Sequence, residues 1–167
     1  MSRWFWWFLL APQTYLAAGL AQDMGLPTFE IGAALCLYLG WFARRSALPW
    51  LLLGCAISRA LVDEASLPVQ ILVLGIPVCV LLPLRTLFVA QRWLWQAAFA
   101  VLLAYGIPWL AGTFGRLFQE PSLGAQLHGW PVVWSAVFVP PLVWLLRHIP
   151  PFVGFTEPEP VFGGTRR

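Results

Sequence analysis

The residues best suited to chemistry lie in the stretch SRALVDEASLP, residues 58–68, which places one arginine and two acids within six positions. Arg59 and Asp63 are four residues apart, so a continuing helical turn would let them pair. Asp63 and Glu64 are adjacent, so on a helix their carboxylates diverge, whereas a general acid and base must converge on one reacting atom. The stretch therefore predicts a polar connection between helices, or a patch that contacts a partner protein through Arg59, Asp63 and Glu64.

No other group of reactive side chains has the spacing of a known site. His128 and His148 lie at opposite ends of the last apolar segment. The three cysteines, Cys36, Cys55 and Cys79, are 19 and 24 residues apart and form neither a C-x-x-C pair nor a Cys/His cluster. Phosphate-binding, dinucleotide-binding, zinc-hydrolase and serine-hydrolase motifs are absent from the sequence. We therefore expect no enzyme activity, no metal and no cofactor.

The composition indicates that lipid surrounds most of the chain. Of its 167 residues, 60% are hydrophobic and only 10% are charged, and the mean hydropathy is +0.76. Soluble domains carry roughly 25% charged residues. All ten basic residues are arginines, and they are spread between apolar segments. Nucleic-acid binding is not expected, because it calls for a basic patch on one face.

The apolar segments predict an all-α, polytopic membrane protein. Residues 1–149 are expected to form a six-helix transmembrane domain, and residues 150–167 a flexible cytoplasmic tail. The first segment is interpreted as a retained helix, not as a cleaved signal peptide. The second and third segments rise only about 24 Å each, so they form either two spans, which we favour, or a re-entrant pair. The predicted segments are 4–22, 28–43, 47–62, 67–84, 93–114 and 125–146.

The arginines predict the orientation of these six spans. With six crossings, eight arginines fall on the side that holds both termini, and only Arg59 and Arg116 fall on the other. Loops rich in arginine stay in the cytoplasm. Both termini are therefore expected to be cytoplasmic.

Small residues and prolines suggest how the helices pack. Ala17-x-x-x-Ala21 and Ala100-x-x-x-Ala104 permit close helix approach in lipid, either inside this bundle or against another subunit. Prolines within the segments can kink the helices. Kinked helices either enclose a cavity for a lipid or small ligand, or pack without one.

One stretch carries a family resemblance. Residues 37–72, LYLGWFARRSALPWLLLGCAISRALVDEASLPVQIL, resemble the bacterial rod-shape-determining protein MreD family in a basic turn, a glycine and an arginine- and acid-containing turn. The matching positions include Arg44-Arg45, Gly54 and Arg59. The sequence departs from the family at Ala60, where an Asp is common nearby, and at Val69.

The resemblance implies a non-catalytic scaffold of the cell-wall elongation and cell-shape machinery in the bacterial inner membrane, with an MreC-like partner. It also implies a helix arrangement similar to that of the substrate-binding subunits of energy-coupling-factor transporters. One alternative is therefore a small-molecule-binding transporter subunit, in which Ala17 and Ala21 would meet the coupling partner. Another is an accessory subunit of a respiratory or photosynthetic complex.

Overall fold

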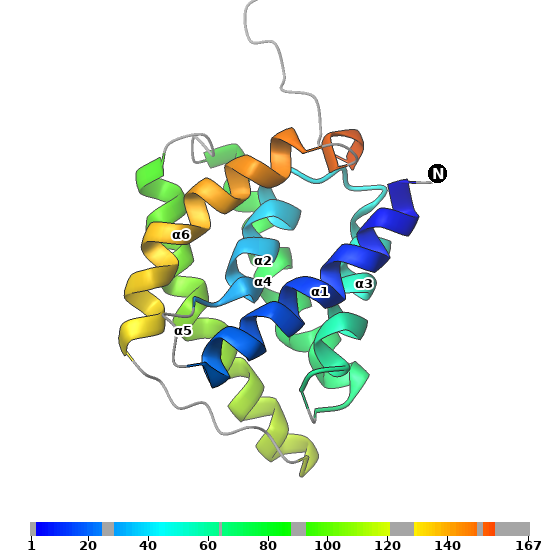
Figure 1. Ribbon diagram of the computed structural model, residues 1–167, viewed down its shortest axis with the longest axis vertical. Helices are drawn as coiled ribbons and strands as arrows, with labels where there is room; N and C mark the ends of the chain where they lie inside the picture. The colour runs from blue at the N-terminus through cyan, green and yellow to red at the C-terminus, as the bar shows by residue number, and fades with distance from the viewer. Residues whose placement is uncertain are drawn as a thin grey trace, which may run out of the picture.

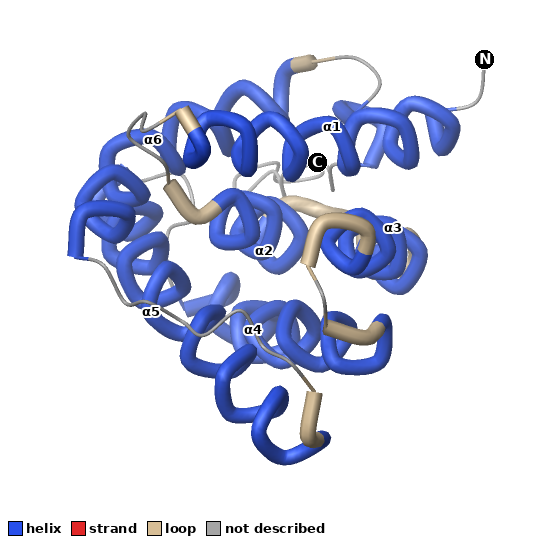
Figure 2. The backbone as a smooth tube through the Cα atoms, turned by 60° about the horizontal axis from the view of Figure 1, so that its bottom comes forward, coloured by secondary structure: helices blue, strands red, loops and turns tan. Residues whose placement is uncertain are grey.

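A computed structural model shows a bundle of six α-helices followed by a short 3-10 turn (Figure 1). The structure describes residues 3–24, 29–63, 65–87, 93–120, 129–149 and 152–155, and these contain no strand (Figure 2). The all-α class predicted from the sequence is confirmed. The elements are α1 (Arg3–Asp23), α2 (Ile31–Trp41), α3 (Leu48–Ala60), α4 (Leu67–Leu87), α5 (Trp93–Phe118), α6 (Gly129–His148) and η1 (Phe152–Phe155).

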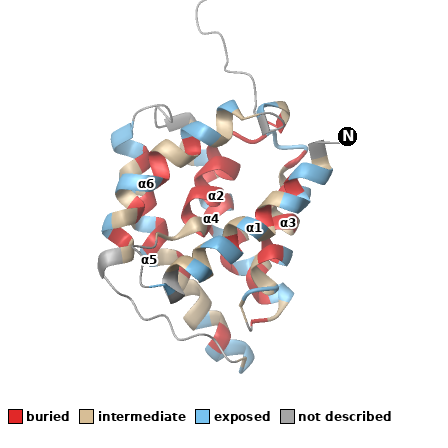
Figure 3. Ribbon diagram, viewed as in Figure 1, coloured by how far each residue is buried: buried red, intermediate tan, exposed pale blue. Residues whose placement is uncertain are grey.

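The helix α2 lies at the centre, and the other five helices surround it. In Figure 2, α1 and α6 lie above α2, α3 and α5 lie to its two sides, and α4 lies below. The central helix contacts all five, and each outer helix contacts its neighbour in the order α1, α3, α4, α5, α6. Ten of the eleven residues of α2 are buried, which Figure 3 shows as a red core.

Successive helices run in opposite directions, and close contacts along the chain establish this. Near one end of α2, Gly32 lies beside Ile107 of α5, and Glu30 just before the helix bonds Ser135 of α6. Near the other end, Trp41 packs on Phe99 of α5. The helices α2, α4 and α6 therefore run one way, and α1, α3 and α5 run the other.

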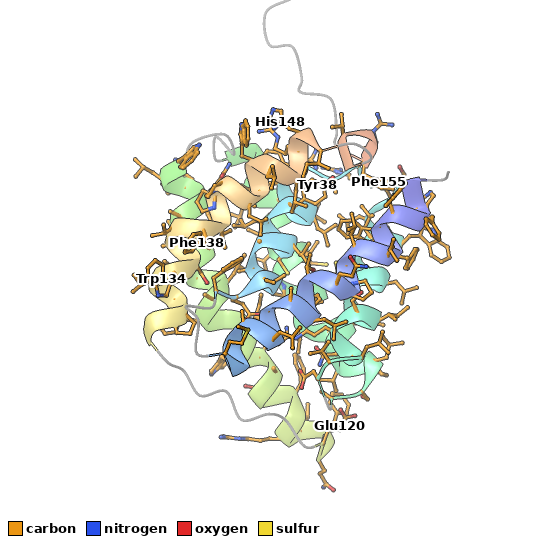
Figure 4. The ribbon with its side chains drawn as sticks, in the orientation of Figure 1. Tyr38, Glu120, Trp134, Phe138, His148 and Phe155 are labelled. Carbon is orange, nitrogen blue, oxygen red and sulfur yellow. The ribbon has the colours of Figure 1, made fainter. Side chains whose placement is uncertain are left out.

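The alternation separates the described arginines into two groups. Arg44, Arg45, Arg85 and Arg147 lie at the end of the bundle where α1 begins and α6 finishes, which we call the arginine-rich end. The opposite end holds the connection between α3 and α4, the end of α5, and the residues Arg59 and Arg116. We call this the arginine-poor end. Figure 4 labels Phe155 and Glu120 at these two opposite ends.

The two middle helices are shorter than the sequence predicts. The segments predicted at 28–43 and 47–62 become helices of 11 and 13 residues. Their rise is about 16 and 20 Å, against about 30 Å for the hydrocarbon core of a bilayer. Protein encloses α2 along its length. Phe42 and Ala43, which directly follow α2, therefore remain buried although they are not helical. Irregular backbone is tolerated at membrane depth when protein surrounds it.

Three helices are long and apolar enough to cross a membrane, by length and composition: Leu67–Arg85, Trp93–Phe118 and Pro131–His148. This finding concerns the described residues only. The helix α1 has 21 residues but carries Gln13 and Thr14 near its middle. Prolines lie inside α1, α4, α5 and α6, and all four helices continue through them.

Part of the predicted tail is folded against the arginine-rich end. Residues 152–155 form η1, and Phe155 is only 1% exposed. Its ring lies 4.7 Å from that of Trp4 and 6.5 Å from that of Trp7, and its carbonyl accepts a hydrogen bond from the Arg44 N–H at 2.8 Å. An aromatic side chain therefore anchors residues 152–155, and the flexibility predicted for the tail as a whole stays a prediction.

Candidate functional site

The arginine-poor end contains the ion pair that the sequence predicts. Arg59 lies in the last turn of α3, and its Nε is 3.8 Å from Oδ2 of Asp63. The two side chains are 13% and 17% exposed, so the pair is largely shielded but still open to the surface. The backbone continues one further turn past α3, with the Asp63 N–H bonding the Arg59 carbonyl at 2.8 Å. This extra turn is what brings the two charges together.

Two further side chains extend this pair into the bundle. Gln70, in the first turn of α4, donates a hydrogen bond from Nε2 to Oδ2 of Asp63 at 2.8 Å and is 1% exposed. Tyr15 of α1 is 8% exposed and lies in the half of α1 nearer the arginine-poor end. We call Tyr15, Arg59, Asp63 and Gln70 the polar cluster.

Each member of the polar cluster has one buried polar atom without a hydrogen-bond partner in the described part of the chain. A buried polar atom left without a partner costs about 1–3 kcal/mol. Such atoms are not confined to the arginine-poor end, since Trp41 Nε1 at the other end is also one, and the polar cluster contributes four. The atoms are the Tyr15 hydroxyl, Arg59 Nη1, Asp63 Oδ1 and Gln70 Oε1.

The surroundings of the cluster are also polar. Cys36 of α2 is buried, and its Sγ lies 3.7 Å from the Leu74 carbonyl. Glu30 precedes α2, and its backbone N–H donates to the Ser135 hydroxyl of α6 at 2.9 Å. Next to Arg59, the Ser58 hydroxyl donates back to the Gly54 carbonyl at 2.6 Å, as serines in helices commonly do.

A second polar contact ties the end of α5 to the start of α4. The backbone N–H of Ser66 donates to Oε2 of Glu120 at 2.8 Å. This bond and a second one from the Ser66 hydroxyl lower the pKa of the Glu120 carboxyl, because they favour its charged form. The contact fixes the connection between α3 and α4 at the surface, close to the polar cluster.

The small-residue pairs singled out in the sequence have different environments. Ala100 and Ala104 are 0% and 5% exposed, so they pack inside this bundle. Ala17 is exposed and Ala21 is half-buried on α1, the helix that contacts only α2, α3 and η1. Of the two pairs, only Ala17 and Ala21 are therefore placed where another subunit could approach.

Some sequence candidates cannot be placed. Glu64 and His128 lie outside the described residues. His148 is exposed at the arginine-rich end, where its Nδ1 lies 2.7 Å from the Trp144 carbonyl and its ring stacks beside Trp144 (Figure 4). It lies at the opposite end from the polar cluster.

Sequence reasoning missed two members of the polar cluster. Gln70 interrupts the apolar run LPVQIL, and Tyr15 follows Gln13 and Thr14 in an otherwise apolar helix. A polar residue inside an apolar span is a usable signal of a functional site. It was not sufficient here, because only the fold brings Gln70 to Asp63.

The cluster combines hydrogen-bond donors with acceptors and contains no nucleophile paired with a base. Within the described ranges, no group of three or more His, Cys, Asp or Glu side chains could hold a metal ion. The cluster comprises two donor atoms and two acceptor oxygens, all closed off from solvent, beside a charge pair whose net charge is zero.

Comparison with known proteins leaves the family open. No family model matches the sequence, and the search finds no match among the curated proteins or the solved structures.

Proposed function

We propose that the chain crosses a bacterial inner membrane six times and has both termini in the cytoplasm. The observation that supports this most directly is the alternation of helix direction together with the separation of the arginines. An even number of antiparallel helices returns the chain to its starting side, and the positive-inside rule assigns the arginine-rich end to the cytoplasm. The short helix α2 needs no full hydrophobic length, because protein and not lipid surrounds it.

Cysteine labelling tests this topology. Cys36, Cys55 and Cys79 are first replaced by alanine, and a single cysteine is then introduced as Ser46→Cys or Val62→Cys, both at exposed positions at opposite ends. A membrane-impermeant maleimide added to intact cells should label position 62 and spare position 46 until the membrane is broken. Labelling of both positions, or of position 46 alone, would refute the six-pass orientation.

Within this topology, we propose that the protein is a non-catalytic, MreD-like scaffold of the cell-wall elongation machinery. The exposed side of α1 supports a scaffolding role. Phe5, Leu16 and Leu20 are 53%, 52% and 64% exposed and follow the spacing of one helix face. Ala17, which is also exposed, borders this stripe, and a Cβ added at nearby Gly19 would meet nothing within 4 Å. A partner helix could therefore approach α1 closely.

Two measurements test the scaffold role. Depletion of the protein should turn rod-shaped cells round, and unchanged morphology would contradict the proposal. Purification of the full chain in mild detergent should recover an MreC-like partner. Recovery of a pair of ATPases would instead indicate a transporter subunit, and recovery of a redox or pigment complex would indicate an accessory subunit.

A matched pair of variants tests the surface on α1. Ala17→Trp blocks close approach to α1, and Ala98→Trp makes the same change at an exposed position on α5, which does not contact α1. We expect Ala17→Trp to lose the co-purifying partner and Ala98→Trp to keep it. Equal recovery with both variants would show that this face of α1 is not the partner surface.

A further inference from the structure

The two ends of the bundle carry opposite charge. The arginine-rich end lies at the top of Figure 1, where η1 and the end of α6 are drawn. The acids that the structure describes all lie at the other end, and they are Asp23, Glu30, Asp63 and Glu120. In the six-pass arrangement, the sequence adds Glu157 and Glu159 to the arginine-rich side, against eight arginines in all. The arginine-rich end therefore has an excess of positive charge.

Three of its arginines come together around the end of α2. The guanidinium of Arg147 lies 4.3 Å from the centre of the Phe42 ring. Arg44 and Arg45 follow Phe42 closely and are exposed in the turn that leads to α3. Because consecutive Cα atoms are 3.8 Å apart, the Cα atoms of both lie within about 11 Å of that of Phe42. The helix α6 and the connection between α2 and α3 thus bring their charges to one place.

Arg85 of α4 extends this group. Leu81 of α4 packs against Gly40 of α2. Arg85 lies one helical turn beyond Leu81, and Arg44 lies four residues beyond Gly40, so both project past the same close contact. We call Arg44, Arg45, Arg85 and Arg147 the arginine surface.

Exposed tryptophans lie at the level of the arginine surface. Trp50 is in the first turn of α3, Trp93 begins α5, and Trp144 is in the last two turns of α6. Each of the three is more than half exposed. In membrane proteins, exposed tryptophans favour the level of the lipid headgroups. The arginine surface is therefore placed where headgroups meet the protein.

We propose that the arginine surface binds anionic phospholipids such as phosphatidylglycerol. The phosphate of such a lipid meets several guanidinium groups, which bind phosphate oxygens well. A zwitterionic lipid also carries an ammonium, which the arginines repel and which no described acid at this end can receive. The inference takes from the proposed function only that the chain lies in a membrane. It requires neither the scaffold role nor a particular orientation.

Native mass spectrometry of the full chain, purified in detergent and stripped of lipid, tests the proposal. The protein is titrated with phosphatidylglycerol and with phosphatidylcholine of the same acyl chains. Each arginine near a headgroup strengthens binding of an anionic lipid by about five-fold. We therefore expect phosphatidylglycerol to be retained at least five-fold more strongly. Equal retention of the two lipids, or retention of neither, would overturn the proposal.

Two arginine variants locate the lipid. Arg45→Gln removes one exposed charge at the arginine-rich end, and Arg116→Gln removes one exposed charge at the other end. Both proteins have the same net charge, so a difference between them reports position alone. We expect Arg45→Gln to weaken retention of phosphatidylglycerol by about three- to five-fold, and Arg116→Gln to leave it unchanged. Equal losses in both variants would show that net charge, and not the arginine surface, retains the lipid.

The double variant Arg44→Gln/Arg45→Gln provides a second measurement at the same turn. It should reduce the preference for phosphatidylglycerol further than Arg45→Gln alone, while an unchanged Tm shows that the fold is kept. A double variant that is folded and retains the full preference would overturn the assignment.

Salt and a soluble competitor distinguish charge from other sources of binding. Because the arginines are exposed, the preference should fall when ammonium acetate is raised from about 0.05 M to about 0.5 M. A preference that does not change with salt would mean that the acyl chains select the lipid. Soluble glycerol phosphate should not displace the lipid, since it lacks the acyl chains that hold the headgroup at this level. Displacement would show that a free anion, and not a lipid, is the ligand. A peptide of glutamates that displaces the lipid would instead identify an acidic protein segment as the occupant. Each of these last three results would contradict the proposal.

Discussion

Aromatic rings close the arginine-rich end of the bundle, whereas polar side chains meet at the arginine-poor end. At the former, Phe155 packs between α1 and the end of α6, and Arg147 lies 4.3 Å over the ring of Phe42. At the latter, Asp63 and Gln70 share a hydrogen bond, yet each keeps a buried oxygen without a partner among the described residues. The two ends therefore differ in what closes them, aromatic packing at one and polar contacts at the other, although a buried polar atom of the same kind, Trp41 Nε1, also lies at the arginine-rich end.

The contrast explains how the polar cluster can be tolerated. The helices α1 and α6 do not contact each other within the described chain, but η1 contacts both. The packing of η1 thus holds the two edges of the ring of helices together at one end. Stability gained there can offset the free energy that buried polar atoms cost at the other. Functional sites commonly have this local cost.

The largest expected effect is at the packed end. Phe155→Ala removes a ring that is 1% exposed and touches Trp4 and Trp7. We expect the free energy of unfolding to fall by about 3 kcal/mol, because a buried aromatic is replaced by a cavity. Denaturation in a mixed-micelle titration measures this. Val153→Ala, at a side chain that is 50% exposed on the same turn, should have little effect. Equal losses for both variants would show that η1 does not close the bundle.

The next largest loss of stability is expected where α2 packs closely against α4. A Cβ added at Gly40 would lie 2.5 Å from Cβ of Leu81, so the two helices would have to separate. We expect Gly40→Ala to destabilise the protein by about 2 kcal/mol, despite the better helix propensity of alanine. Gly106→Ala on α5 is the control, because its added Cβ meets nothing within 4 Å. It should stabilise by up to about 1 kcal/mol. The same denaturation assay compares the two variants, and a neutral Gly40→Ala would contradict the close packing.

Much of the fold could be predicted from the sequence, because apolar segments bounded by charge and turn residues define helices directly. Gly54 and Gly40 show what could not be predicted. Gly54 admits the ring of Trp7 from α1, and Gly40 admits Leu81 from α4. Nothing in the sequence pairs these residues. The short length of α2 could not be predicted either, because only the assembled bundle shows that protein encloses this helix.

The candidate site could be predicted only in part. The pairing of Arg59 with Asp63 follows from helical spacing and is confirmed. The approach of Tyr15 and Gln70 depends on α1 and α4 packing beside α3, and no local pattern indicates it. The partner contacts predicted for Arg59, Asp63, Glu64 and the two pairs of small residues stay predictions. Ala100 and Ala104 face the interior, where their small size lets α5 approach its neighbours.

A smaller effect is expected for the Arg59–Asp63 ion pair, and its size shows how much this pair stabilises the arginine-poor end. A double-mutant cycle of Arg59→Gln and Asp63→Asn keeps hydrogen-bonding groups in place while removing each charge. We expect a coupling energy of about 0.5 kcal/mol, because the 3.8 Å pair is long and retains access to solvent. The coupling should fall as salt is raised. A coupling of several kcal/mol would instead mean that this end is held as firmly as the aromatic end.

The smallest effect concerns the contact between Ser66 and Glu120 at the surface of the same end. Hydrogen bonds from the Ser66 hydroxyl and backbone N–H hold the pKa of Glu120 in the folded protein below its usual value. Because the pKa of Glu120 is lower in the folded protein than in the unfolded chain, the contact with Ser66 contributes its full stability above the unfolded pKa. This contribution is lost as the pH falls through the folded pKa. Between pH 7 and pH 3, the Tm of the unmodified protein should therefore decrease slightly more than that of Glu120→Gln.

Ser66→Ala is the matched variant for this contact. It removes the hydroxyl but keeps the backbone N–H that donates to Glu120 at 2.8 Å, so it should give an intermediate pH dependence. Differential scanning fluorimetry in detergent at several pH values measures all three proteins. Identical profiles would show that the carboxylate is fully solvated and that the contact contributes nothing to stability. The arginine-poor end would then depend on the polar cluster and the packing beneath it, which would sharpen its difference from the aromatic end.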